Sequence, residues 1–181
     1  MTLPVIMHVN YCEQGQTLDE ICFKAVNWGF DGVEFRRKRS WPEQDTEEYL
    51  DELGNAVLKH GLKYVIFGSP GPDLMIEDEG ERQEQVCKAA EFYKLASQRF
   101  KLTVCNTFTG LLLNSDKRID YSEYNRHGSF IAEDKHWNWA SEGFKVLAKV
   151  AEELGFKFAF ETHMCYIHDL PVSTRKLINL I

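Results

Sequence analysis

The stretch GFKFAFETHMCYIHD, residues 155–169, passes from a helix end into a short apolar strand and then into polar side chains. Gly155 stands where a helix-ending glycine is expected. Side chains alternate along a strand, so its aromatic residues share the face that we expect to pack under helices: Phe156, Phe158 and Phe160. The opposite face leads to Glu161 and His163. A carboxylate and an imidazole at the end of a buried strand indicate a functional site there.

The same order of strand, polar loop, amphipathic helix and glycine recurs along the chain. Thr17 and Glu20 have the spacing of a capping box at the start of the first predicted helix. Gly29 and Gly61 follow helical patterns, as Gly155 does. Apolar, β-branched and aromatic runs predict strands at residues 5–9, 32–35, 63–67, 102–106 and 157–161. Five βα units are therefore predicted.

Two architectures fit this alternation, because parallel strands need a helical crossover between them. The length of 181 residues suits an open sheet of about five strands, whereas a complete (β/α)8 barrel runs to about 250 residues. The strand sequences VIMHVN, GVEFR and FAFETH favour the barrel, since each carries polar side chains that are costly between two helix layers. We expect a single α/β domain over residues 1–181, a partial (β/α)8 TIM barrel of five parallel βα units. An open, flavodoxin-like doubly wound sheet is the alternative.

The composition argues against several classes of partner. The net charge is −7 and the basic run RRKR, residues 36–39, stands alone, whereas a nucleic-acid partner needs a basic face. No apolar run reaches the roughly 18 residues of a membrane span, and the N-terminus lacks a signal-peptide pattern. Five cysteines without a CxxC spacing indicate reduced thiols. We expect a cytoplasmic protein that binds neither nucleic acid nor membrane.

Polar side chains at the ends of three predicted strands are expected to meet at one rim. They are His8, Glu34, and the pair Glu161 and His163. The carboxyl ends of parallel strands form one edge, where α/β folds place ligand and catalytic groups. Glutamate with histidine suits a divalent cation such as Mn²⁺, Mg²⁺ or Zn²⁺, and it equally suits a carboxylate base beside a hydrogen-bonding imidazole.

Each of these residues also has a structural interpretation. Glu161 could pair with an arginine or lysine, and His8 could be a hydrogen-bonded core histidine. Glu34 could pair with Arg36 or Arg37.

Two further features lie near this rim in the sequence. Asp169 precedes a proline and a serine, so we expect it to shape the turn into the last helix. The polar segment 107–135 is long for a connection in a compact domain, and loops of that length are often functional lids.

These motifs resemble the xylose-isomerase-like TIM barrel family of sugar isomerases and epimerases. The resemblance runs from GFDGVEFR through CNTFTG to FAFETHMCYIHDLPVSTRKLINLI. It implies one divalent metal held by four residues, of which Glu161 matches the first, and a proton shuttle in which Glu161 is one of two carboxylates. His163 is similar to the substrate-contacting histidine and Glu34 to the acidic residue after strand two. We also predict substrate contacts from His8 and from Asn106 in CNTFTG.

The sequence stops inside the fifth predicted helix, so the last three βα units of such a barrel and its other three metal ligands are expected to be missing. Exposed sheet edges then favour a homo-oligomer. The leading hypothesis is metal-assisted proton transfer alpha to a carbonyl of a ketose or related polyol, with Mn, Mg or Zn if the site is completed. The alternative is a non-catalytic, truncated relative that binds carbohydrate or self-assembles. A nuclease is disfavoured by the charge. The sequence leaves open whether the chain is an enzyme.

Overall fold

The computed structural model describes residues 3–8, 15–36, 44–69 and 71–181. Within them, strands and helices alternate in the predicted order. The strands are β1 (Ile6–His8), β2 (Gly32–Arg36), β3 (Tyr64–Ser69), β4 (Val104–Thr107) and β5 (Lys157–Phe160). The helices are α1 (Leu18–Asn27), α2 (Thr46–His60), α3 (Glu79–Arg99), α4 (Asp134–Leu154) and α5 (Pro171–Ile178).

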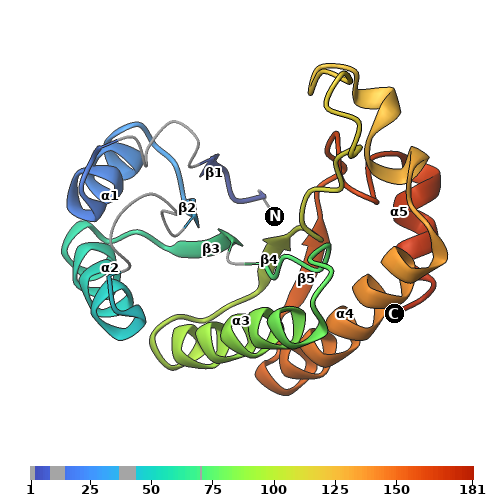
Figure 1. Cartoon of the computed structure of the whole chain (residues 1–181). Helices are drawn as coiled ribbons and strands as arrows, with labels where there is room; N and C mark the ends of the chain where they lie inside the picture. Colours follow the sequence, from blue (N-terminus) through green and yellow to red (C-terminus); the bar gives the residue numbers. More distant parts are fainter. Residues whose placement is uncertain (1–2, 9–14, 37–43, 70) are drawn as a thin grey trace.

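The elements form an arc with the strands inside and helices along the outside (Figure 1). Every strand pair is parallel: β1, β2 and β3 form one hydrogen-bonded group, and β4 pairs with β5. A doubly wound sheet would carry helices on both faces, and here they cover the convex face. The predicted partial barrel is therefore confirmed. Within the described residues, no ladder of backbone hydrogen bonds joins β3 to β4, which the sequence did not predict.

Local sequence signals set the helix ends. The backbone N–H of Glu20 donates to the Thr17 hydroxyl (3.2 Å) and the N–H of Thr17 donates to the Glu20 carboxylate (2.9 Å), which completes the predicted capping box. Gly61 and Gly155 cap α2 and α4 with φ of 71° and 75°. Glycine adopts this left-handed conformation without steric cost, so both predicted helix ends are explained by residue type.

The phenylalanine face of β5 packs as the strand alternation predicts. The Phe156 ring lies 5.3 Å from the Tyr93 ring of α3, and the Phe160 ring lies 4.8 Å from the Phe144 ring of α4. These contacts belong to one hydrophobic core that includes residues from all five βα units. The helices thus bury one face of each strand and leave the other face, which carries Glu34 of β2 and Asn106 of β4, on the inside of the arc.

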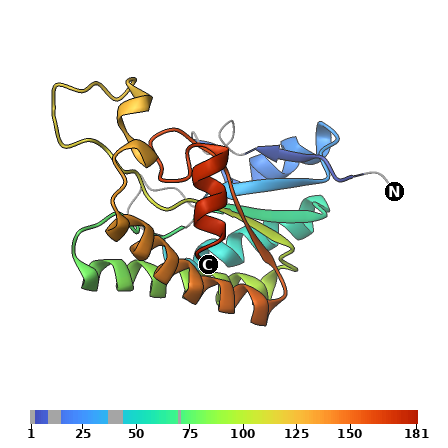
Figure 2. The ribbon, with the colours of Figure 1, turned by 90° about the vertical axis from the view of Figure 1, so that its right-hand side faces the viewer.

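A projecting segment, residues 108–133, leaves the carboxyl end of β4 and extends beyond the strands (Figure 2). It holds two short 3-10 helices, Tyr124–Arg126 and Gly128–Phe130. The Leu112 N–H donates to the carbonyl of Cys165 (2.9 Å), and the Ser129 N–H donates to the Asp169 carboxylate (3.1 Å). The segment is therefore tied to the loop that follows β5.

Asp169 also performs the local role that its position predicts. Its other carboxylate oxygen accepts from the Ser173 hydroxyl in the first turn of α5 (3.2 Å). One side chain thus fixes both the start of α5 and the projecting segment.

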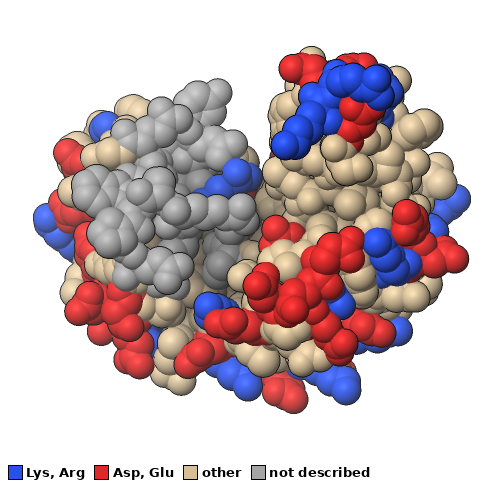
Figure 3. Space-filling view, in the orientation of Figure 1, with Lys and Arg blue, Asp and Glu red and all other residues tan. Residues whose placement is uncertain are grey.

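Charge is unevenly distributed over the surface. Acidic side chains gather around the start of α3, while the part of the surface above them, on the right in Figure 3, is mostly uncharged. The exposed acidic residues there include Glu77, Asp78, Glu79 and Glu81. Among the described helices, none combines the length and the apolar character that crossing a membrane requires.

Gly32 of β2 lies in close contact with both neighbouring strands, β1 and β3. A methyl group at this position would lie 2.5 Å from the Cβ and the carbonyl oxygen of Tyr64, and 2.9 Å from Ile6 Cδ1. Because backbone atoms cannot move aside as a side-chain end does, we expect Gly32→Ala to lower the free energy of unfolding by about 1–3 kcal/mol. Denaturant unfolding followed by circular dichroism measures this change.

Gly54 of α2 provides the matched control, since the nearest atom to an added methyl group lies 4.0 Å away. Gly54→Ala is expected to raise the free energy of unfolding by about 0.5–1 kcal/mol, because alanine is the better helix former. Equal effects of the two substitutions would contradict the close strand contact at Gly32.

Candidate functional site

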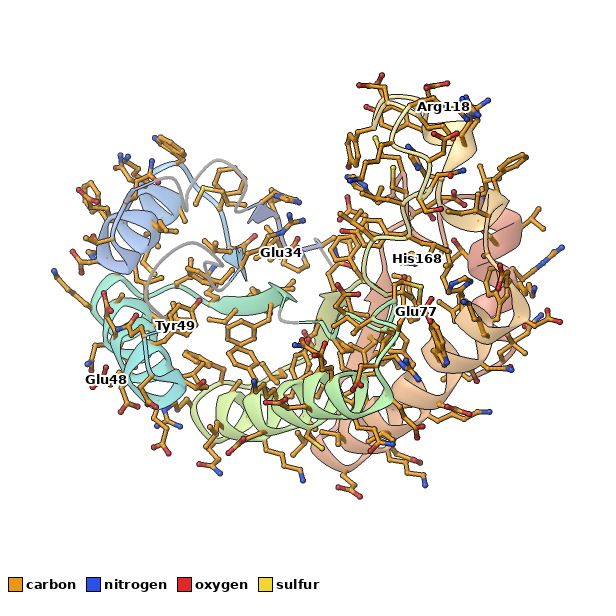
Figure 4. The ribbon with its side chains drawn as sticks, in the orientation of Figure 1. Glu34, Glu48, Tyr49, Glu77, Arg118 and His168 are labelled. Atoms are coloured by element: carbon orange, nitrogen blue, oxygen red, sulfur yellow. The ribbon has the colours of Figure 1, made fainter. Side chains whose placement is uncertain are left out.

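Side chains from three strand ends meet on the inner side of the arc, where Figure 4 places Glu34. The amide nitrogen of Asn106, from β4, donates to Glu161 Oε2 at 3.0 Å and to Glu34 Oε1 at 3.4 Å. Glu161 directly follows β5 and Glu34 belongs to β2. The structure therefore brings together three of the predicted site residues.

Arg36 joins this group from the end of β2. Its Nη2 atom lies 3.8 Å from Glu161 Oε2, and its guanidinium lies 5.7 Å from the centre of the Phe108 ring. The side chains of Arg36 and Glu161 are 29% and 40% exposed, so solvent screens this ion pair and its contribution to stability is small. The sequence analysis gave Arg36 as a possible partner of Glu34 and an arginine or lysine as a possible partner of Glu161, and the structure shows the second of these pairings. Arg37 lies outside the described residues.

His8 shares the rim with Glu34. The parallel register pairs the two residues across β1 and β2, and paired residues of neighbouring strands present their side chains on the same face. The predicted proximity of His8 and Glu34 therefore follows from the strand pairing.

His163 is placed differently from the sequence expectation. Strand β5 ends at Phe160, so the alternation that put Glu161 and His163 on one face does not extend that far. The imidazole instead packs edge-on against the rings of Phe108 (6.2 Å) and Tyr166 (5.7 Å). Because Phe108 also lies under Arg36, His163 belongs to an aromatic wall beside the carboxylates.

His168 is the buried histidine of this region, and Figure 4 shows it in the half of the arc that carries β5. It is fully buried, its Nδ1 lies 3.3 Å from the Thr109 hydroxyl, and its ring contacts those of Phe160 and Tyr166. Burial lowers the pKa of His168 from 6.5 to about 4, while the charge of Asp169 acts in the opposite direction. The imidazole is therefore neutral at physiological pH.

The sequence reasoning missed two members of the aromatic wall, Phe108 and Tyr166. Both lie in loops, where no periodicity reports which way a side chain points. The alternation of side chains in GVEFR could have indicated Arg36, because it shares a strand face with Glu34.

The chemistry of the side chains decides how well they suit a divalent metal. In the described part of the chain, no three histidine, cysteine, aspartate or glutamate side chains gather in a way that could hold an ion. Glu161 has Glu34, Asn106 and the cationic Arg36 as its neighbours. Mg²⁺ takes about six ligands and Zn²⁺ about four, so this set of side chains does not fit a divalent cation by itself.

A separate apolar groove runs along β5. It has a volume of about 600 Å³ and is lined by the aromatic face of the strand together with residues of α4, α5 and the chain end, among them Ala148, Ile178 and Ile181. Within the described residues β5 pairs only with β4, so its other edge is open. This groove lies on the helix-facing side of β5 and is distinct from the carboxylate cluster.

The sequence profile described as xylose isomerase-like TIM barrel matches residues 22–181. The chain belongs to the xylose isomerase-like TIM barrel family. This match covers four of the five strands and all the described helices except the first residues of α1. A comparison with curated protein sequences gives no significant match.

Solved structures with this family's fold superpose on nearly the whole chain. A 3-keto-D-glucoside 4-epimerase from E. coli has a TM-score of 0.70 at 15% identity, with 98% of this chain and 64% of that chain covered. A D-allulose 3-epimerase from Methylomonas sp. has a TM-score of 0.68 at 12% identity, with 98% and 58% covered. A mannonate dehydratase from Streptococcus suis has a TM-score of 0.61 at 17% identity, with 100% and 62% covered.

This xylose isomerase-like chain therefore spans about three fifths of the length of those structures. At such low identity the likeness establishes the fold alone.

The pKa of His168 predicts how the stability of this family member depends on pH. The folded-state pKa of about 4 lies below the unfolded value of 6.5, so the unfolded chain binds the proton first as the pH falls. The stabilisation is present above pH 6.5 and is lost toward pH 4. Between about pH 7 and about pH 5, His168 should account for a loss of about 2 kcal/mol in the free energy of unfolding.

We expect His168→Gln to show a correspondingly smaller pH dependence, measured by urea unfolding at several pH values. His163→Gln is the control, because that side chain is partly exposed. A thermal unfolding curve at neutral pH checks that each variant folds. An unchanged slope in His168→Gln would show that another group carries the pH dependence.

Proposed function

We propose that this protein takes part in isomerase or epimerase chemistry on a ketose or a related polyol, with Glu161 as the group that moves a proton. The observation that carries the proposal is the cluster of Glu161, Glu34 and Asn106 at the carboxyl ends of the strands. Family membership supports the reaction class, because sugar epimerases are among the solved structures with a similar fold. A carboxylate in this place suits proton transfer next to a carbonyl.

In the proposed step, the Glu161 carboxylate takes the proton from the carbon next to the substrate carbonyl. The electrons of the broken C–H bond form a carbon–carbon double bond, and the carbonyl electrons move to the oxygen, which gives an enediolate. Inversion of that carbon then requires a second acid, which gives a proton to the opposite face while Glu161 keeps the proton that it took, and Glu34 is the other carboxyl group of the cluster. For an isomerisation, Glu161 instead returns its proton to the former carbonyl carbon, and the hydroxyl proton of the first carbon moves to the former carbonyl oxygen.

The other rim residues are proposed to bind and orient the sugar. Glu34 and His8 offer hydrogen-bonding groups to hydroxyls on the β1–β2 side of the rim, and His163 with Phe108 offers an aromatic wall on the β5 side. The guanidinium of Arg36 is the cation nearest to Glu161 in the described structure. Negative charge moves from Glu161 to the enediolate during the step, so this cation stays beside the charge throughout.

The proposal includes a divalent ion (Mn, Mg or Zn) only if residues outside the described part of the chain complete its ligand set. Glu161 would be one of its ligands, and further ligands would have to come from outside the described residues, because those present do not suffice. When bound, such an ion would polarise the substrate carbonyl.

We also propose that the chain is one domain with five of the eight βα units of the family barrel.

A cytoplasmic location is part of the proposal. The described cysteines are free thiols, and burial raises the pKa of Cys22 and Cys105 to about 12. Unpaired, unreactive thiols are typical of proteins from reducing compartments.

Exchange of the substrate α-proton with solvent deuterium tests the role of Glu161 directly. We expect wild-type protein to incorporate deuterium into at least one of D-fructose, D-allulose and D-tagatose, measured by proton NMR with EDTA and again with added manganese chloride. Glu161→Gln should lower the exchange rate by about 100-fold or more, since the amide is not a base.

Glu153→Gln is the matched control, because Glu153 is an exposed glutamate at the end of α4, away from the rim. It should exchange protons at the wild-type rate. Exchange that survives in Glu161→Gln would remove Glu161 from the reaction. No exchange by wild type under either condition would favour the non-catalytic carbohydrate-binding or self-assembling relative.

We also propose that two copies of the chain associate through the open edge of β5. An unpaired strand edge next to an apolar groove invites pairing with another strand, and a two-fold axis lets the same edge of a second copy pair with it antiparallel. Light scattering should then give a mass above that of one chain.

Ile178→Lys, in the groove, should shift the mass toward one chain, because it would bury a charge at the interface. Leu58→Lys is the control, since Leu58 is 82% exposed on α2, away from β5. A wild-type mass equal to one chain would exclude the self-association.

A further inference from the structure

The amide of Asn106 has a fixed orientation. Its oxygen accepts the backbone N–H of Thr107 at 2.9 Å, and an N–H only donates. Its nitrogen therefore faces Glu161 and Glu34, whose carboxylates accept hydrogen bonds when ionised. No other assignment of the amide satisfies all three neighbours, because the reversed amide would set its oxygen against two carboxylates.

The two oxygens of Glu161 differ in their surroundings. Asn106 Nδ2 and Arg36 Nη2 both approach Oε2, at 3.0 Å and 3.8 Å. Among the described residues, no hydrogen bond or ion pair reaches Oε1 of Glu161. Oε2 is thus anchored by side chains from two different strands, β4 and β2.

The carboxylate of Glu34 is held between strand β3 and the amide of Asn106. A methyl group at Gly68 of β3 would collide with the Glu34 carboxylate, so the glycine lets this carboxylate lie directly against the β3 backbone. The second contact of the Asn106 amide then reaches Glu34 Oε1. Four successive strands contribute to one arrangement: Glu34 from β2, Gly68 from β3, Asn106 from β4, and Glu161 after β5.

We propose that Asn106 is a positioning residue that holds Glu161 so that Oε1 alone meets the substrate proton, and that fixes Glu34 relative to it. This inference rests on the proposed function for its chemistry and on the distances around Asn106 for the contacts. A carboxylate free to rotate would present either oxygen in many orientations. Anchoring one oxygen removes that freedom before the substrate binds, which favours proton transfer over mere binding.

The first test needs no activity. In an amide proton–nitrogen correlation spectrum of the whole chain, the side-chain signals of Asn106 are identified by their loss in Asn106→Asp. They should shift in both Glu161→Gln and Glu34→Gln, because a charge-assisted hydrogen bond becomes a neutral one. They should stay in place in Glu153→Gln. Chemical shifts of the Asn106 side chain that are unchanged in both Glu161→Gln and Glu34→Gln would overturn the proposal.

The second test separates positioning from structure through kinetics of deuterium exchange. Asn106→Ala should lower kcat by about 10- to 100-fold, the effect of losing a hydrogen bond to a charged group, and change KM by no more than about twofold. Asn55→Ala, at an exposed position of α2, should change neither constant. A rise in KM that matches the loss in kcat would overturn the positioning role.

The two tests distinguish a failure of the positioning role of Asn106 from a failure of the proposed function. Side-chain signals that respond as expected support the arrangement even where wild type exchanges no protons, and that result would count against the proposed function alone. Exchange that proceeds at the wild-type rate in Asn106→Ala would overturn the positioning role and leave the function of Glu161 standing.

Discussion

Parallel pairing of short strands is the constraint on which the rest of this structure depends. Because every pair runs the same way, Glu34 of β2, Asn106 of β4 and Glu161 after β5 reach the same rim, although they lie far apart in the sequence. The helical crossovers that parallel strands require then cover the convex face. The candidate site is a consequence of this topology before any particular side chain is considered.

Burial on one face only explains how charged residues are tolerated in the strands. The phenylalanines of β5 pack against Tyr93 and Phe144 in the core, and the alternate positions face the inside of the arc. Glu34 and Glu161 can therefore sit at strand ends without the cost of burying an ionised group between two helix layers. The fold separates an apolar face that supplies stability from a polar face that supplies chemistry.

Much of the fold could be predicted from local patterns. The capping box of Thr17 and Glu20, the helix-ending glycines Gly61 and Gly155, and the phenylalanine alternation of β5 all depend on neighbours a few residues away. The site could be predicted only in part. Glu34, Asn106 and Glu161 are brought together as the strand ends implied, but His163 was placed by extending β5 past Phe160, where the chain leaves the strand.

The sequence by itself determined the order of the elements, the parallel direction of the strands and the rim at which polar residues gather, because periodicity and turn chemistry are local properties. Only the tertiary structure decided that one amide links two carboxylates, that Arg36 lies beside Glu161, and that Phe108 and Tyr166 form a wall with His163. Those contacts join residues from different loops and strands. Their geometry depends on side-chain directions and loop paths that no spacing in the sequence encodes.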